Sequence, residues 1–259
     1  MKYFVVDAFA EKIFEGNPAG VCVMKDWLSD DLMQKIAIEN NLSETAFALR
    51  EGAHYRLRWF TPGGEINLCG HATLATAFVI MNYYEKELAS VQFDTMSGLL
   101  TVNRIDDLYE LDFPAVPSEE YPVTEQIIEA LGVTPIEAYI NRDLVLVLES
   151  EEAVINANPD FAKLEKLPDG LGVCITAKGT EYDFVSRGFF PKLKINEDPV
   201  TGSLHCSLLP YWAKRLDKKE MTAKQVSKRG GTLYCKYEDT RVKMAGKAAL
   251  YSVADLYLE

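Results

Sequence analysis

The sequence predicts an α+β protein built from two similar halves, each a curved, mostly antiparallel, barrel-like sheet around a central apolar helix. Two observations support this fold class. Three sequence features recur in the same order at an offset of roughly 130 residues. Two expected helices, at about 72–83 and 203–215, are apolar on nearly every face, so each should lie inside a sheet. We expect the halves to be related by pseudo-two-fold symmetry.

The recurring features are a strand end, a helix start and a later strand that begins at glycine. LRWFTP at 57–62 resembles SRGFFP at 186–191, and each ends a strand shortly before an acidic residue and a helix. Further along, SGLLTV at 97–102 matches GGTLYC at 230–235 in pattern. Chance recurrence of strand, turn and helix is the alternative, and three ordered matches favour a duplication. The space between the halves would then be the expected ligand site.

The first half is expected to span residues 1–115. A turn is expected at Gly16–Gly20, where glycine tolerates a positive φ and proline fixes its own. Ser29 can cap a helix over 30–39, which has acidic residues in its first turn. The central helix follows Gly70. Strands are expected at 3–6, 21–24, 43–49, 55–60, 91–94, 98–103 and 108–113.

The second half is expected to span 116–248, and the last residues, about 249–259, to join the first half. The proline-rich stretch 114–121 is the candidate linker. Helices are expected at 124–131, near 159–164 and at 203–215. Strands are expected at 138–140, 144–148, 172–176, 182–187, 232–237, 241–244 and 248–253.

The composition limits the classes of function. With 259 residues, 48% of them apolar, the chain can bury a substantial core. Its net charge of −12 argues against nucleic-acid binding. No apolar run approaches the ~18 residues of a membrane helix, and the start of the chain lacks signal-peptide features. Five cysteines without a CxxC pair suit a cytoplasmic protein with reduced thiols, and three histidines without ligand spacing predict no metal.

Glu44 and His71 are candidate catalytic residues of the first half. Glu44 begins an otherwise apolar strand, and burial there would raise its pKa toward neutrality, where a carboxyl group exchanges protons readily. A surface glutamate at a strand start is an equal alternative. His71 follows Gly70 just inside a helix start, where it can contact a ligand bound to free backbone N–H groups. A capping or packing histidine is the alternative.

The second helix start offers Asp198, Gly202 and Ser203. Asp198 precedes a proline in an expected turn, where it either stabilises the helix start or orients a catalytic partner. Gly202 and Ser203 would supply N–H groups and a hydroxyl to an anion, while a capping role for Ser203 is compatible with that contact.

Two cysteines lie near the helix starts. Cys69 precedes Gly70, where a thiolate would be stabilised, whereas Cys206 lies about one turn inside its helix and is expected in the core. This unequal spacing disfavours a symmetric two-thiol site. Neither a dinucleotide fingerprint nor a P-loop is present, and Ser203 lacks the Gly-x-Ser-x-Gly context of serine hydrolases. Nicotinamide and ATP sites and serine hydrolysis are therefore not expected.

The chain resembles the PhzF-like (phenazine biosynthesis-like) isomerase family over nearly its whole length. The motifs that carry this resemblance are GNPAG (16–20), LSETAF (42–47), RWFTP (58–62), LCGHAT (68–73), EDPVTGS (197–203) and QVSKRGG (225–231). The resemblance implies a diaminopimelate epimerase-like fold, with the active site between two halves. It also implies that Glu44 shuttles a proton, that His71 and Asp198 assist, and that Gly70 and Ser203 contact substrate.

The implied reaction is a cofactor-independent proton transfer along a small carboxylated metabolite. Related epimerases and racemases use one cysteine in each half; Cys69 matches the first, whereas the second place is taken by Pro199. An amino-acid racemase or epimerase and a non-catalytic small-molecule binding module are the alternatives. A homodimer is the default expectation for the assembly.

Overall fold

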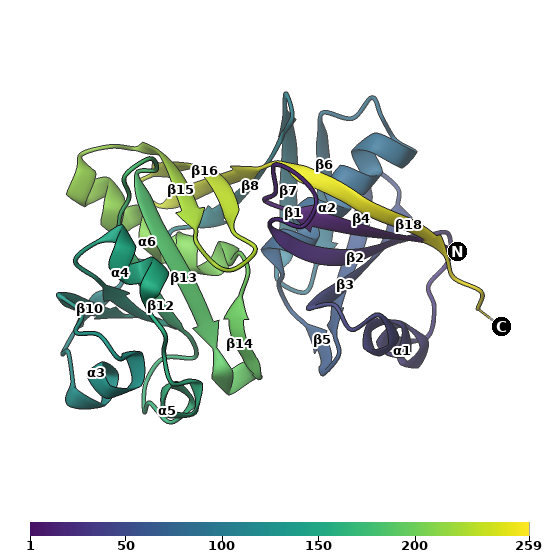
Figure 1. Ribbon diagram of the computed structural model, residues 1–259. Helices are drawn as coiled ribbons and strands as arrows, with labels where there is room; N and C mark the ends of the chain where they lie inside the picture. Colours follow the sequence, from purple (N-terminus) through teal and green to yellow (C-terminus); the bar gives the residue numbers. More distant parts are fainter. Residues whose placement is uncertain (259) are drawn as a thin grey trace. The chain divides into compact units, whose positions relative to one another are not determined.

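The computed structural model describes residues 1–258, which fold into two compact units. Unit 1 consists of Met1–Asp112 and Ala245–Glu259, and unit 2 of Phe113–Met244 (Figure 1). The boundaries expected from the sequence differ from these by a few residues. The pseudo-two-fold relation between the halves stays a prediction.

Unit 1 is a curved sheet around one helix. Most of its strand pairs are antiparallel, while β2 pairs with β3, and β4 with β6, in parallel. Its strands are β1 (Lys2–Ala8), β2 (Asn17–Met24), β3 (Glu44–Glu51), β4 (His54–Thr61), β5 (Gly64–Ile66), β6 (Ser90–Thr95), β7 (Gly98–Ile105), β8 (Leu108–Pro114) and β18 (Ala248–Asp255). Its helices are α1 (Asp30–Asn40), α2 (Gly70–Val79) and the π-helical turn η1 (Ile80–Tyr84).

Unit 2 has its own sheet and central helix. Its strands are β9 (Glu119–Tyr121), β10 (Glu137–Ile140), β11 (Leu144–Val147), β12 (Val173–Lys178), β13 (Phe184–Phe190), β14 (Ile195–Asp198), β15 (Glu220–Gln225), β16 (Gly231–Glu238) and β17 (Arg241–Gly246). Its helices are α3 (Glu125–Leu131), α4 (Glu151–Asn156), α5 (Phe161–Glu165), the 3-10 turn η2 (Pro191–Leu193) and α6 (Gly202–Leu216).

The two units share one pairing scheme. In unit 1, β2 pairs with β1 antiparallel and β3 parallel, and β4 pairs with β3 and β5 antiparallel and β6 parallel. In unit 2, β11 pairs with β10 antiparallel and β12 parallel, and β13 pairs with β12 and β14 antiparallel and β15 parallel. The strand-by-strand match supports the duplication expected from the sequence.

An arginine clamp recurs at equivalent places in the two units. Arg58 in β4 binds both carboxylate oxygens of Glu65 in β5, at 2.6 and 2.7 Å, and its guanidinium lies over Phe60. Arg187 in β13 binds both oxygens of Glu197 in β14, at 2.7 and 3.1 Å, and lies over Phe189. The similarity of LRWFTP and SRGFFP is therefore a repeated three-dimensional contact.

The central helix α2 is almost fully buried, whereas α6 is buried over about half of its residues. All residues of α2 except Gly70 and Phe78 are buried, and the helix contacts β1, β2, β3, β7 and β18. In unit 2, Trp212 of α6 donates to Thr176 Oγ1 of β12 at 3.0 Å and stacks on Phe184 of β13. No helix within residues 1–258 is long and apolar enough to cross a membrane.

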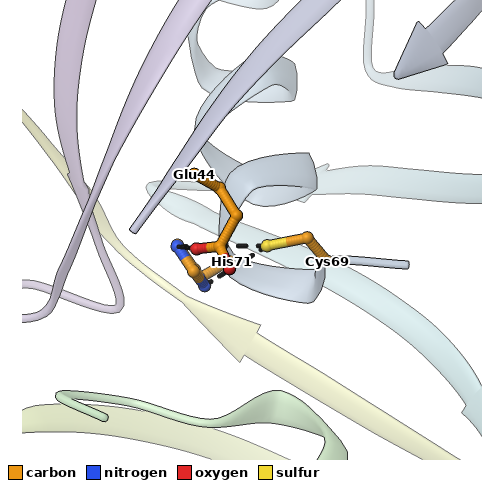
Figure 2. A group of neighbouring side chains, drawn as sticks. All are labelled: Glu44, Cys69 and His71. Carbon is orange, nitrogen blue, oxygen red and sulfur yellow. Dashed lines mark hydrogen bonds and ion pairs between the residues drawn. The ribbon is translucent and has the colours of Figure 1, made fainter. Parts of the chain in front are cut away.

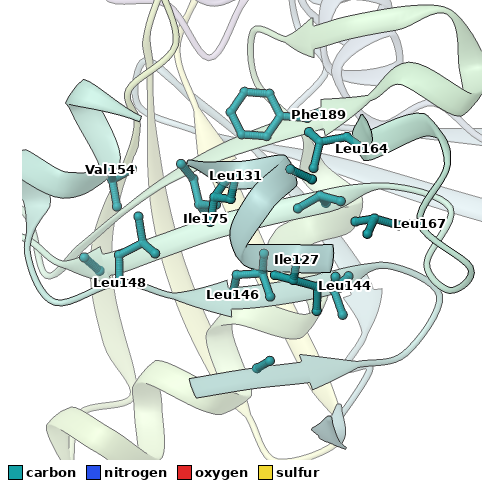
Figure 3. Close-up of a cluster of buried hydrophobic side chains, with 14 of the residues drawn as sticks. Ile127, Leu131, Leu144, Leu146, Leu148, Val154, Leu164, Leu167, Ile175 and Phe189 are labelled. Atoms are coloured by element: carbon teal, nitrogen blue, oxygen red, sulfur yellow. The ribbon is translucent and has the colours of Figure 1, made fainter. Parts of the chain in front are cut away.

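The outer face of each sheet carries a second apolar layer. In unit 1, Met33 and Ile36 of α1 pack with Phe47 and Phe60. In unit 2, a larger cluster lies between the sheet and α3, α4 and α5 (Figure 3). Strands such as β3 are therefore covered on both faces, which explains their continuous apolar sequence.

The structure corrects several elements expected from the sequence. Residues 17–20 belong to β2, so the expected turn is limited to the residues before Asn17, where Gly16 has φ +65°. Asp198 ends a strand instead of lying in a turn. In α1, Ser29 caps as expected, and Met33, Ile36 and Ala37 are the buried residues. The sequence pattern did not predict β5, β9, β14, β15 or α4, which are short or polar, and β9 lies within the expected linker at 114–121.

Candidate active site

Three buried polar side chains meet at the start of α2 in unit 1 (Figure 2). Glu44 is the first residue of β3, opposite Ala19 of β2, and Cys69 and His71 flank Gly70 at the helix start. Each of the three is at most 8% exposed. Burial of three such groups together is costly unless they pair with one another, so their geometry decides their chemistry.

Glu44 and His71 form an ion pair. Oε2 of Glu44 lies 3.0 Å from Nε2 of His71. The other ring nitrogen of His71, Nδ1, lies 3.5 Å from Cys69 Sγ. Apart from His71, no hydrogen-bond donor within residues 1–258 reaches Glu44 Oε2. This oxygen therefore keeps accepting capacity for a proton.

The ion pair reverses the effect expected for Glu44. Burial raises the pKa of Glu44, but the charge of His71 and hydrogen bonds from His71, Ser43 and Cys69 outweigh it, so the pKa lies below its ordinary value. Burial lowers the pKa of His71, but its interactions with Cys69 and Glu44 outweigh burial, so the pKa lies well above its ordinary value. The pair is a carboxylate and an imidazolium, and the prediction of a raised Glu44 pKa was wrong.

The expectation of a stabilised Cys69 thiolate was also wrong. Burial and the nearby Glu44 carboxylate raise the pKa of Cys69, despite its place at the helix start. The thiol is therefore protonated at neutral pH. Cys206 is buried in α6 as expected, and its thiol donates to the Gly202 carbonyl across 3.7 Å.

Asn17, which the sequence analysis did not single out, completes the group. It is fully buried, and its side-chain nitrogen Nδ2 lies 3.3 Å from Nδ1 of His71. Both ring nitrogens of an imidazolium donate, so the charged form of His71 requires the amide of Asn17 to turn its oxygen toward the ring. The hydroxyl of Ser43 lies 3.4 Å from Oδ1 of Asn17. Because a hydroxyl can donate or accept, it can bond to either the oxygen or the nitrogen of the amide. The GNPAG motif was the available signal.

In unit 2, Asp198 belongs to a network at the start of α6. Its Oδ2 accepts from the hydroxyl of Thr201 at 2.5 Å. The fully buried Gln225 donates from Nε2 to the Asp198 carbonyl at 2.7 Å and accepts the Thr201 N–H at 2.8 Å. These bonds fix the residue before the helix, so an orienting role for Asp198 has a structural basis.

Ser203 does not cap α6 as expected. The N-cap residue is Thr201, whose side chain makes no capping bond, and Ser203 is the second helical residue. The Ser203 hydroxyl instead accepts from Arg142 Nη2 at 2.9 Å. No atom lies within 4 Å of the place where a Cβ of residue 202 would be, so packing does not require glycine at this position. His71, Gly70 and Glu44 lie together in unit 1, and Asp198, Gly202 and Ser203 lie together in unit 2.

Comparison with known proteins identifies the family. A model of the phenazine biosynthesis-like proteins matches residues 6–254. The chain belongs to the phenazine biosynthesis-like (PhzF) family. An uncharacterized isomerase of Pseudomonas aeruginosa is 51% identical over 96% of each chain. The crystal structure of an Enterococcus faecalis PhzF-family protein is 52% identical, with a TM-score of 0.98 over 99% of each chain. The protein is thus a PhzF-like isomerase, and its α+β fold class is confirmed.

A distant likeness concerns the fold alone. A hydroxyproline epimerase of Agrobacterium vitis, crystallised with trans-4-hydroxy-L-proline, has a TM-score of 0.66 at 10% identity, over 98% of this PhzF-like chain and 91% of its own. The helix starts of the two units allow a direct positional comparison. The residue before α2 is Cys69, and the residue before α6 is Thr201, so the position expected for a second thiol is Thr201 instead of Pro199.

The PhzF-like chain also places three potential metal ligands together, contrary to the expectation from histidine spacing. Ligand atoms of Glu44, Cys69 and His71 lie within 4.8 Å of one another, as no other such group within residues 1–258 does. Carboxylate, thiolate and imidazole are all zinc ligands. Coordination of a metal ion by these three residues would require the Cys69 thiol to lose its proton and the ion pair between Glu44 and His71 to break.

The ion pair predicts a pH dependence of stability for this PhzF-like isomerase. Because the pKa of Glu44 is lowered in the folded protein, its carboxylate contributes its full stabilisation above pH 4.5 and loses it as the pH falls. Because the pKa of His71 is raised, its imidazolium contributes its full stabilisation below pH 6.5 and loses it as the pH rises. The loss of unfolding free energy in His71→Asn should therefore be largest between pH 4.5 and 6.5 and shrink toward alkaline pH. Urea denaturation at several pH values measures it.

His54 provides the matched control for this pH series. It is exposed at the start of β4, and no residue within 1–258 pairs with its imidazole. The His54→Asn variant should show no such trend. A His71→Asn penalty that grows from pH 6 to about 9 would contradict the charge assignment of the pair.

Proposed function

We propose that this isomerase is cofactor-independent and moves a proton on a small carboxylated metabolite, with Glu44 as general acid and base. The observation that carries the proposal is the buried Glu44 carboxylate, ionised beside His71 and with spare accepting capacity on Oε2. A carboxylate in that state can take a proton from carbon without any prior deprotonation.

One carboxylate suffices for the whole reaction. Glu44 removes a proton from a carbon next to an electron-withdrawing group and becomes a neutral acid. The electron pair moves into the conjugated system of the substrate, and Glu44 returns a proton to another carbon on the same face. The His71 imidazolium, relieved of its anionic partner, stabilises the negative charge that develops on the substrate.

The lowered pKa of Glu44 constrains the substrate. A weakly basic carboxylate can remove a proton only from an activated carbon, so an unsaturated carboxylate or a related electron-poor system is favoured. The free N–H groups and positive dipole end at Gly70 favour an anionic group nearby. We further propose that Asp198, Gly202 and Ser203 of unit 2 contribute orientation and substrate contact. That the site lies between the halves stays a prediction.

A two-base racemase is the second candidate, and the helix starts disfavour it. The Cys69 thiol has a raised pKa, and Thr201 stands at the equivalent place in unit 2. A non-catalytic binding module is a third candidate. It is disfavoured because Glu44 is a buried, ionised carboxylate that can accept a proton. The homodimer and the cytoplasmic location stay predictions.

Incubation with small carboxylates and amino acids in D₂O tests the proposal. For a true substrate, mass spectrometry should detect deuterium uptake without added cofactor, because the proton that Glu44 holds in the intermediate can exchange with solvent before it is returned. Uptake only at the α-carbon of an amino acid, with inversion, would favour the racemase. Binding without exchange of any tight-binding candidate would favour the binding module.

A further inference from the structure

Unit 2 contains a cavity whose wall is held in place by a proline inside α6. Pro210 lacks an N–H group, so it cannot bond the carbonyl of Cys206 one turn earlier. That carbonyl instead accepts the N–H of Val116, at 2.9 Å. The chain at Val116 is thereby tied to the helix, and the residues that follow it, 117–120, form one side of the cavity.

The cavity has a volume of about 580 Å³, within the range of small-molecule sites. Its walls are the 117–120 segment and one face of α6, and Tyr139 and the buried Val145 of the sheet line it as well. The rings of Tyr139 and Tyr211 meet edge to face, 5.3 Å apart. Together with two prolines they offer flat apolar surfaces to a ring-shaped ligand. The lining residues are Pro117, Ser118, Glu120, Tyr139, Val145, Ser207, Pro210, Tyr211, Lys214 and Arg215.

Two serine hydroxyls in this cavity are left as hydrogen-bond donors. The side-chain amide of Asn141 donates to Ser118 Oγ at 2.5 Å and to Ser207 Oγ at 2.8 Å. Each hydroxyl thus accepts from the amide, and no acceptor within residues 1–258 takes the hydrogen that it can still donate. The half-buried Ser118 and buried Ser207 therefore favour a ligand that accepts hydrogen bonds.

The charges at the cavity leave one cation unpaired. The carboxylate of Glu137 accepts from the hydroxyls of Tyr139 and Tyr211, at 2.8 and 3.0 Å, and also pairs with Arg215. Lys214 lies one residue before Arg215 on the same helix, and no group within residues 1–258 pairs with its ammonium. Glu120, at the exposed edge, is the remaining anion of the lining and disfavours ligands of high negative charge.

We propose that this cavity is a second ligand site, which binds a small ring-bearing monocarboxylic acid. The ring lies against Tyr139, Tyr211 and Pro210, and the carboxylate accepts from Ser118 and Ser207 and pairs with Lys214. None of these residues belongs to the Glu44 group, so the site does not depend on the proposed reaction.

Benzoate is the probe, with the neutral benzamide as its isostere. In ¹⁵N–¹H NMR titrations of the full chain, benzoate should shift amides of 118–120, 139–145, 207–209 and 211–215 saturably, with a dissociation constant on the order of 1 mM. Benzamide should bind several-fold more weakly. Absence of a saturable shift, or equal binding of the two probes, would overturn the proposal.

Two substitutions locate the site, and two controls separate it from other effects. Lys214→Met and Ser118→Ala should each weaken benzoate binding by about fivefold, because each removes one exposed or half-exposed polar contact. Lys166→Met, which removes an exposed lysine of unit 2 outside the cavity, and Glu44→Gln should leave binding unchanged. Binding that persists in both cavity variants, or that is lost with Glu44→Gln, would place benzoate elsewhere and refute the assignment.

Discussion

Replacement of Glu44 by glutamine should reduce solvent-deuterium incorporation into an identified substrate by on the order of 10²–10⁴-fold. Glutamine keeps the size of the side chain and can still contact His71, but its amide cannot take up a proton. The reduction should appear in kcat, because proton transfer occurs after the substrate has bound. Mass spectrometry of the substrate in D₂O, compared at saturating concentration, measures it.

Glu51 gives a matched control for this variant. It is the last residue of β3, at the end of the strand opposite Glu44, and it is exposed. Glu51→Gln changes the same charge on the same strand and should keep the wild-type exchange rate. Exchange retained in a folded Glu44→Gln protein would rule out Glu44 as the proton carrier and would move attention to the thiol of Cys69.

Replacement of Arg187 by methionine should lower the free energy of unfolding of unit 2 by about 3 kcal/mol. The guanidinium binds Glu197 through two nitrogens and donates from Nη1 to the carbonyl of Ala157 at 2.7 Å, beyond the end of α4. It is 13% exposed, so solvent replaces these bonds poorly. Methionine retains much of the apolar stem but leaves the Glu197 carboxylate and the carbonyl without their donor. Chemical denaturation followed by tryptophan fluorescence measures the loss.

The equivalent arginine of unit 1 supplies the comparison. Arg58 also binds its glutamate with two nitrogens, but its third partner is the side chain of Asp30, which is 75% exposed. Water can replace that contact, so Arg58→Met should cost less, about 1–2 kcal/mol. A larger loss of unfolding free energy for Arg58→Met than for Arg187→Met would contradict the view that the bond to the Ala157 carbonyl makes the difference.

The duplicated fold was predictable because its signals are local and strong. Both central helices are rich in apolar residues, and the arginine motifs precede them at similar distances. The missed strands show where such signals fail. β5 has only three residues, and β15 alternates lysine, threonine and glutamate with buried residues in a way that polarity alone does not distinguish from a loop. Their pairing is set by tertiary contacts with β4 and β13.

The residues of the candidate site could be predicted from the sequence, but their ionisation states could not. Glu44 and His71 could be named from their places at a strand start and a helix start. Their separation of 3.0 Å depends on how β3 and α2 pack, which no local pattern encodes. Without that distance, burial alone predicts a raised pKa for Glu44; with it, the His71 charge outweighs burial and the sign is reversed. Asn17 was missed for the same reason, since its importance lies in a contact across 54 positions of sequence.

The pairing of β18 with β1 has a consequence for synthesis of the chain. The first strand of unit 1, β1, pairs with β18, which follows unit 2 in the chain, and the amino group of Met1 donates to the Leu256 carbonyl at 2.8 Å. On the ribosome, unit 1 therefore lacks a strand until residues 248–255 have been synthesised, whereas the segment of unit 2 is contiguous and emerges earlier. During that interval the open edge of β1 is available for pairing with other nascent chains, so it is here that a chaperone would protect the growing protein.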